Sequence, residues 1–248
     1  MTTEHHVLIA KDWDCPIVLA GCYRKIKRHD KAEIYTSSTI VNCRWNTTIY
    51  NSWKLHVIVH GDYKLCPSCS KPHPVGFVPG ISAPALADMV KNSKLPNKLG
   101  AKIRLDICFS GMGGPDSLAY QLKKNLGLNS NYSVSGVKGA SVPGWGTDFS
   151  LKKTRMVIGS TNIDQLDSKV DLAKKEWGDA MANYKKSWWC AKILGNLAKP
   201  DSPSKKFKIL AKLVHLLGEK TVKEFYNEIR SKGLVLDKTQ SENYKIYW

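Results

Sequence analysis

The sequence lacks several features that define other classes of protein. No apolar run approaches the roughly 20 residues that a membrane-spanning helix needs. The first residues carry no basic segment of the kind that opens a secretory signal, and the apolar run after them is interrupted by Lys11 and Asp12. We therefore expect a chain with no transmembrane segment and no signal peptide.

Acidic residues are scarce relative to basic ones. The chain has 21 Asp and Glu against 38 Lys and Arg, which gives a formal net charge of +17. Such a charge attracts anionic partners, but the basic residues are spread along the whole chain and form no arginine-rich tail. We therefore predict a soluble, generally basic surface and do not expect nucleic acid as a partner.

Cysteine is neither abundant nor regularly spaced. The chain has seven, whereas small secreted disulfide frameworks are denser and even-numbered, so a reducing compartment is favoured. Cys66 and Cys69, with His73 nearby, have the spacing of half a zinc site. Because a second cysteine pair of this kind is missing, we expect no metal there. The alternatives are a loop disulfide or two free thiols.

Residues 1–160 alternate between strand and helix patterns. This alternation indicates an α/β domain with a mostly parallel central sheet flanked by helices. The expected strands are residues 7–10, 16–21, 55–59, 102–107, 132–137 and 154–158, and helices are expected to begin near residues 84 and 118. Residues 63–80 are rich in Pro, Cys, Ser and Gly and predict a long irregular loop.

Residues 161–248 form a second unit, a C-terminal helical region. Helices are expected at residues 164–194, 204–217 and 221–231, with Gly218 ending the second. The second helix has an apolar stripe made of Phe207, Leu210, Val214 and Leu217. A basic amphipathic helix can lie on an anionic membrane, but such a stripe more commonly packs against a core, and we predict core packing here.

Two chemically versatile residues follow two of the predicted strands. His60 comes directly after strand 55–59 and Cys108 directly after strand 102–107, with one helix between these strands. A strand–helix–strand unit in one sheet is almost always right-handed and parallel, so both strands end at the same edge, where ligands bind. The sequence therefore predicts that a base and a nucleophile meet at this edge.

The neighbours of these two residues suit acyl transfer. A thiolate at Cys108 is a strong nucleophile, and His60 can act as its base and then protonate the departing amine. Gly61 has no side chain, so its backbone N–H beside His60 can reach a developing oxyanion. The N–H groups of Gly61 and Cys108 are therefore the predicted oxyanion donors. The glycines after Cys108 permit a tight turn that exposes the sulfur.

This pattern resembles the caspase-type superfamily of cysteine peptidases (clan CD), and within it the branch of bacterial toxins and effectors. The resemblance covers roughly residues 50–140 and rests on His60-Gly61 and on the segment Asp-Ile-Cys-Phe-Ser-Gly at residues 106–111. It implies a caspase-like sandwich and a cysteine endopeptidase with a His60–Cys108 dyad. It also implies a virulence-related thiol protease that cleaves itself or host proteins, located in the cytoplasm or delivered into a host cell by a specialised secretion system.

Asp106 gives a further expectation about the substrate. Residues two apart in a strand face the same side of the sheet, so Asp106 and Cys108 share a face. In the superfamily that the chain resembles, the position of Asp106 often lines the S1 pocket, which implies a substrate with Arg or Lys at P1. The alternative is an Asp bound to a loop N–H.

The resemblance also implies an anionic activator. Toxin self-processing domains are switched on by inositol hexakisphosphate, so the basic segments at residues 24–28, 152–155 and 205–212 are candidates for its binding. No cofactor is expected to be required, and the expected partner is a protein or peptide substrate. A non-enzymatic module that binds a partner through the same scaffold and basic surface is the alternative, and uniform reactivity of the cysteines would favour it.

Overall fold

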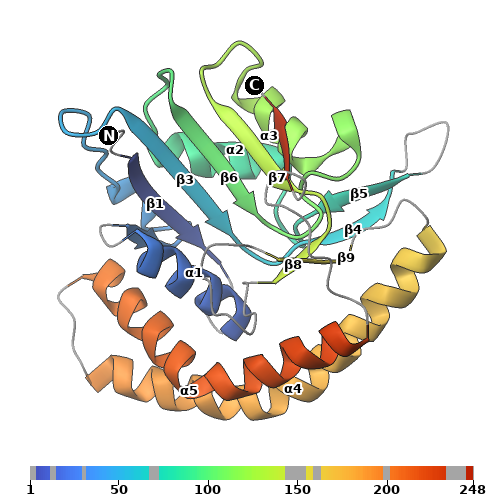
Figure 1. Cartoon of the computed structure of the whole chain (residues 1–248). Helices are drawn as coiled ribbons and strands as arrows, with labels where there is room; N and C mark the ends of the chain where they lie inside the picture. Colours follow the sequence, from blue (N-terminus) through green and yellow to red (C-terminus); the bar gives the residue numbers. More distant parts are fainter. Residues whose placement is uncertain are drawn as a thin grey trace.

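A six-stranded sheet forms the centre of the computed structural model, which describes residues 4–11, 15–29, 32–66, 73–142, 155–158, 163–197, 202–232 and 244–247. The strands are, in spatial order, β10 (Tyr244–Tyr247), β7 (Ser133–Val137), β6 (Ala101–Asp106), β3 (Ser52–Ile58), β1 (Glu4–Ala10) and β2 (Glu33–Tyr35). All neighbours are parallel except β10, which pairs antiparallel with β7 (Figure 1). The prediction of a mostly parallel α/β sheet is confirmed.

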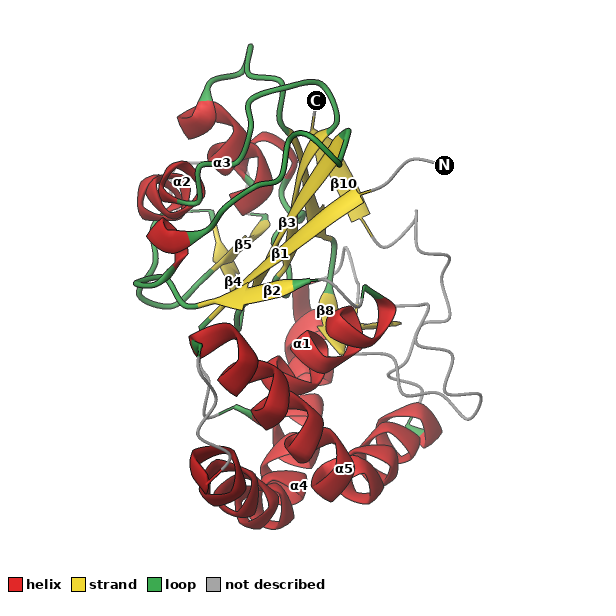
Figure 2. Ribbon diagram, turned by 90° about the vertical axis from the view of Figure 1, so that its left-hand side faces the viewer, coloured by secondary structure: helices red, strands yellow, loops and turns green. Residues whose placement is uncertain are grey.

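Helices cover both faces of this sheet (Figure 2). The helices are α1 (Pro16–Arg28), α2 (Ala83–Asn92), α3 (Leu118–Leu126), α4 (Ile163–Leu197) and α5 (Pro203–Ser231), with short 3-10 turns at Ile40–Asn42 and Gly114–Asp116. Helices α2 and α3 pack on one face, and α1 packs on the other with α5 and α4 behind it. Within the described residues, no helix is both long and apolar enough to cross a bilayer.

The two faces of the sheet bury different side chains. Ile103 and Leu105 on β6, and Ile107 directly after it, are fully buried against α2 and α3. The residues between them, Arg104 and Asp106, are polar and lie on the side of α1. The period-2 geometry of a strand thus separates an apolar face from a partly polar one.

The region before β2 differs from the prediction. Residues 16–21 were expected to be a strand, but they begin helix α1, with Pro16 in its first turn. Val18, Leu19 and Cys22 are buried at helical spacing on the face that packs against the sheet. A short apolar run does not distinguish a strand from a buried helix, and here packing selected the helix.

Two further predictions about secondary structure were wrong. The expected irregular loop at residues 63–80 contains a hairpin of β4 (Asp62–Leu65) and β5 (Pro74–Phe77), although residues 67–72 lie outside the described part. Helix α5 continues through Gly218 to Ser231. A helical glycine costs only about 1 kcal/mol relative to alanine, and Gly218 is buried, so tertiary packing outweighs its tendency to end the helix. A smaller sheet pairs β8 (Ala140–Val142) with β9 (Arg155–Ile158).

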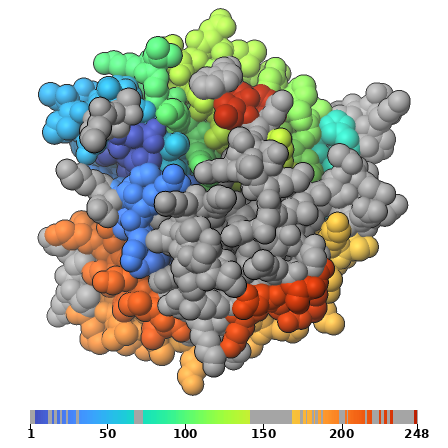
Figure 3. Space-filling view, in the orientation of Figure 1, coloured from blue at the N-terminus to red at the C-terminus, as the bar shows by residue number. Residues whose placement is uncertain are grey.

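The C-terminal region is joined to the sheet domain through shared packing. Ala191 of α4 and Ala211 and Val214 of α5 are buried in the same cluster as residues of α1 and β1. Figure 3 shows the α4–α5 region along one side of the molecule, against the blue α1 segment. Strand β10 then returns to the opposite edge of the sheet. Residues 161–248 therefore add helices to one face and a strand to one edge.

Candidate active site

His60 and Cys108 each lie two residues beyond a strand of the central sheet. Strands β3 and β6 are adjacent and parallel, and Ile58 pairs with Asp106 at their carboxyl ends. The pairing ends there, and His60 and Cys108 follow the two strand ends at the same edge of the sheet. His60 is exposed and Cys108 is partly exposed, so solvent reaches both residues.

Gly61 lies directly against the backbone of Cys108. A Cβ atom at position 61 would be 3.0 Å from the Cys108 nitrogen and 2.6 Å from Cγ2 of Ile107, and closer still to the Cys108 carbonyl oxygen. Only glycine allows this approach. The main-chain groups of Gly61 and Cys108, which were predicted to form the oxyanion hole, are therefore neighbours in the structure.

The chain turns sharply after Cys108. Phe109 is 2% exposed and adopts a left-handed backbone conformation with a φ of 60°, which is a strained position for a bulky side chain. Hydrogen bonds hold the turn: the Phe109 N–H donates to Gly139 O at 2.9 Å, and the buried Ser110 hydroxyl donates to Ile107 O at 2.8 Å. The same hydroxyl accepts the Val137 N–H at 3.0 Å. These three hydrogen bonds fix the turn that follows the partly exposed Cys108.

The structure adds a thiol that the sequence analysis did not place in the site. Cys15 is the N-cap residue of α1, and its sulfur lies 2.8 Å from Nε2 of His60. It is partly exposed and not disulfide-bonded. Pro16 at the next position is a known signal for a helix start, but contact between His60 and Cys15 depends on where α1 packs.

Asp106 is held in a buried network of ion pairs. Its carboxylate lies 3.0 Å from Lys25 Nζ, 3.1 Å from Arg104 Nε and 3.3 Å from His56 Nδ1. Burial alone would raise the pKa of Asp106, but Lys25, Arg104 and His56 outweigh it and hold the pKa well below its usual value. A basic P1 residue would therefore have to compete with two bound cations, and the alternative of a loop N–H bound to Asp106 stays a prediction.

The remaining cysteines differ in their environment. Burial raises the pKa of the Cys22 thiol well above its usual value and that of Cys43 to about 12. Cys190 on α4 is free and exposed, and Cys69 lies outside the described residues. Cys66 is disulfide-bonded, but the predicted loop disulfide to Cys69 stays a prediction because Cys69 is not among the described residues.

The predicted half zinc site is only partly assembled. Donor atoms of Cys66, His73 and Asp116 lie within 4.8 Å of one another, and His73 Nε2 is 3.3 Å from the Asp116 carboxylate. The sulfur of Cys66 is oxidised in the disulfide, so it is not a thiolate ligand.

The candidate activator segments lie on helices α1 and α5 and at the start of β9, which begins at Arg155. Lys25 in α1 is paired with Asp106, while Lys27 and Arg28 are exposed. In α5, Lys205 and Lys212 are exposed and burial lowers the pKa of Lys208. Residues 152–154 lie outside the described part. Comparison of the chain with protein-family models, with curated proteins and with solved structures gave no match.

Proposed function

We propose that the chain is a cysteine peptidase with Cys108 as nucleophile and His60 as acid and base, built on a caspase-like arrangement of the sheet. The observation that carries the proposal is the contact of Gly61 with the Cys108 backbone at the ends of two adjacent parallel strands. This contact supports the proposal because His60, the proposed base, directly precedes Gly61, and Gly61 lies against the backbone of Cys108, the proposed nucleophile. The strained turn at Phe109 adds support, because such strain is commonly found at active sites.

The proposed reaction has two steps. The Cys108 thiolate attacks the carbonyl carbon of a peptide bond, and the N–H groups of Gly61 and Cys108 stabilise the oxyanion that forms. The C–N bond then breaks, and His60 gives a proton to the departing amine. In the second step His60 takes a proton from water, the hydroxide attacks the thioester, and the C–S bond breaks to release the carboxylic acid and restore the thiolate.

His60 contacts Cys15 in the resting arrangement. The Cys15 sulfur lies within hydrogen-bond distance of the imidazole nitrogen that would serve the substrate. Substrate binding would therefore turn His60 away from Cys15 and toward the scissile bond. Cys15 is proposed to position His60 before the reaction and not to attack the substrate. The proposal includes no P1 preference, because the Asp106 carboxylate is already bound by two cations.

The test compares three single cysteine variants of the full chain. Cys108→Ala, Cys15→Ala and the exposed control Cys190→Ala are assayed with a fluorogenic peptide library that varies at P1, and by incubating the chain with itself. We expect Cys108→Ala to lower kcat/KM by about 10³-fold or more, as expected when a nucleophile is removed. Cys15→Ala should change it by less than about tenfold, and Cys190→Ala should leave it unchanged.

Alkylation of the wild-type chain provides an independent measurement. An activated Cys108 should react with iodoacetamide faster than Cys190, which is exposed on α4. Cys108 would be excluded as the nucleophile if the Cys108→Ala variant still cleaved peptides. The same conclusion would follow if only the Cys15→Ala variant lost cleavage. Absence of cleavage together with equal alkylation of Cys15, Cys108 and Cys190 would favour the non-enzymatic binding module instead.

A further inference from the structure

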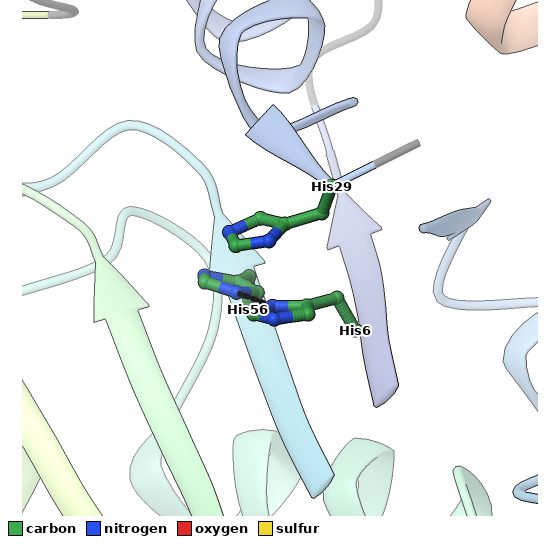
Figure 4. A group of neighbouring side chains, drawn as sticks. All are labelled: His6, His29 and His56. Carbon is green, nitrogen blue, oxygen red and sulfur yellow. Dashed lines mark hydrogen bonds between the residues drawn. The ribbon is translucent and has the colours of Figure 1, made fainter. Parts of the chain in front are cut away.

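Three histidines from separate segments meet beneath helix α1. His6 on β1 and His56 on β3 are buried, with 6% and 1% exposure, and His29 is the partly buried C-cap residue of α1. Figure 4 shows the His29 ring lying over the other two. Nδ1 of His6 is 3.1 Å from Nε2 of His56, and the rings of His6 and His29 stack with centroids 3.4 Å apart.

Two carboxylates fix the tautomers of the buried pair. Nε2 of His6 lies 3.1 Å from the Glu4 carboxylate, and Nδ1 of His56 lies 3.3 Å from that of Asp106. An ionised carboxylate only accepts hydrogen bonds, so each ring must donate its N–H on the carboxylate side. The remaining nitrogens, His6 Nδ1 and His56 Nε2, then both present lone pairs, and they face each other.

Two facing lone pairs at 3.1 Å repel unless a cation lies between them. A metal ion satisfies both lone pairs. Zinc–nitrogen bonds of about 2.0–2.1 Å in a tetrahedral site set neighbouring nitrogens about 3.3 Å apart, close to the observed separation.

We infer that His6, His29 and His56 form a binding site for a divalent transition-metal ion of the zinc type. One nitrogen of each ring lies within 4.8 Å of the others. Because the His29 ring stacks on His6 at an interplanar angle of 15°, His29 would have to turn about its side-chain bonds to direct a lone pair at the same ion. Histidine ligands whose second nitrogen donates to a carboxylate are typical of zinc sites. Bound metal would tie β1, β3 and the end of α1 together.

The charges around the cluster limit the affinity. Lys25 is bound to Asp106 at 3.0 Å and Lys54 lies 3.5 Å from Glu4, so each carboxylate that orients a histidine also pairs with a cation. Three neutral imidazoles provide no negative charge to offset a dication. We therefore expect a dissociation constant on the order of micromolar, weaker than that of closed thiolate sites.

The test uses the full chain carrying Cys15→Ala and Cys108→Ala, so that the two thiols near the sheet edge do not compete for metal. The chelator-treated protein is titrated with Zn²⁺ against a chromophoric chelator, and with Co²⁺ while the visible absorption is recorded. We expect one ion per chain, a tetrahedral Co²⁺ spectrum with nitrogen ligands, and an upward shift of Tm with Zn²⁺.

Two matched variants locate the ion. His29→Gln, at a partly exposed position, should weaken Zn²⁺ binding at least tenfold, whereas His73→Gln, in the group with Cys66 and Asp116, should bind as before. Glu4→Gln should weaken Zn²⁺ binding about 10–100-fold. Without the Glu4 carboxylate, His6 is no longer held in the tautomer that carries its proton on Nε2 and leaves Nδ1 for the metal. Absence of stoichiometric binding by folded protein would overturn the inference. Full affinity in His29→Gln, or loss in His73→Gln alone, would overturn it equally.

Discussion

The two faces of the central sheet are built from the same strands but differ in composition. Toward α2 and α3, β6 presents Ile103 and Leu105, and Ile107 follows the strand; all three are fully buried. Toward α1, the same strand presents Arg104 and Asp106, which join buried ion pairs. Burial of apolar side chains stabilises the first face, and this effect does not depend on the direction of any single contact. Each buried polar group on the other face instead needs a specific hydrogen-bond or ion-pair partner. The ionisable side chains of this strand therefore lie on the face toward α1.

The largest expected effect comes from breaking the ion-pair network on the polar face. Asp106→Asn leaves Lys25 and Arg104 buried without their carboxylate, and we expect a loss of about 3–5 kcal/mol in the free energy of unfolding. Urea denaturation measures this loss. The control Asp88→Asn removes an exposed partner of Lys91 and should cost less than about 0.5 kcal/mol. Equal effects in the two variants would show that the network contributes no more than a surface pair.

The next effect concerns the apolar face. Leu105→Ala leaves a cavity among residues packed under α2 and α3, and we expect a loss of about 3 kcal/mol in the free energy of unfolding. The rate at which Cys108 reacts with iodoacetamide should not change, because the variant acts on the opposite face. A slowed reaction under conditions where the protein stays folded would show that the two faces are coupled.

A smaller effect is expected where the two strand ends touch. Gly61→Ala forces a Cβ into the Cys108 backbone, and we expect a loss of about 1–3 kcal/mol of stability together with lower peptidase activity. Gly178→Ala is the control, because a Cβ at Gly178 in α4 would meet nothing within 4 Å among the described residues outside its own helix. It should raise stability by up to about 1 kcal/mol. Unchanged stability and activity in Gly61→Ala would contradict the close contact.

The smallest effect concerns helix α5, which packs behind α1. Lys205 and Lys212 of α5 are exposed, and we predict that inositol hexakisphosphate at about five times its dissociation constant adds about 1 kcal/mol of stability. This corresponds to a rise of about 2–4 °C in Tm. The double variant Lys205→Ala and Lys212→Ala should lose the rise, while the charge-matched control Lys98→Ala and Lys124→Ala should keep it. A rise that both double variants share equally would indicate nonspecific attraction to the basic surface.

Local patterns in the sequence predicted much of the sheet. The strands around residues 55–59, 102–107 and 132–137 appear as β3, β6 and β7, and the helices near residues 84 and 118 appear as α2 and α3. Ser117 caps α3 by accepting the Tyr120 N–H, as its residue type favours. These features depend on spacing and on caps that lie within a few residues.

The placement of His60 and Cys108 after two parallel strands follows from the chain alone, because the period of a strand and the handedness of a crossover are local properties. Three other contacts depend on long-range packing: Cys15 with His60, Lys25 with Asp106, and His29 with His6. All three require α1, whose first residues have the composition of a strand. Its helical form and its position are set by the burial of its apolar side against the sheet.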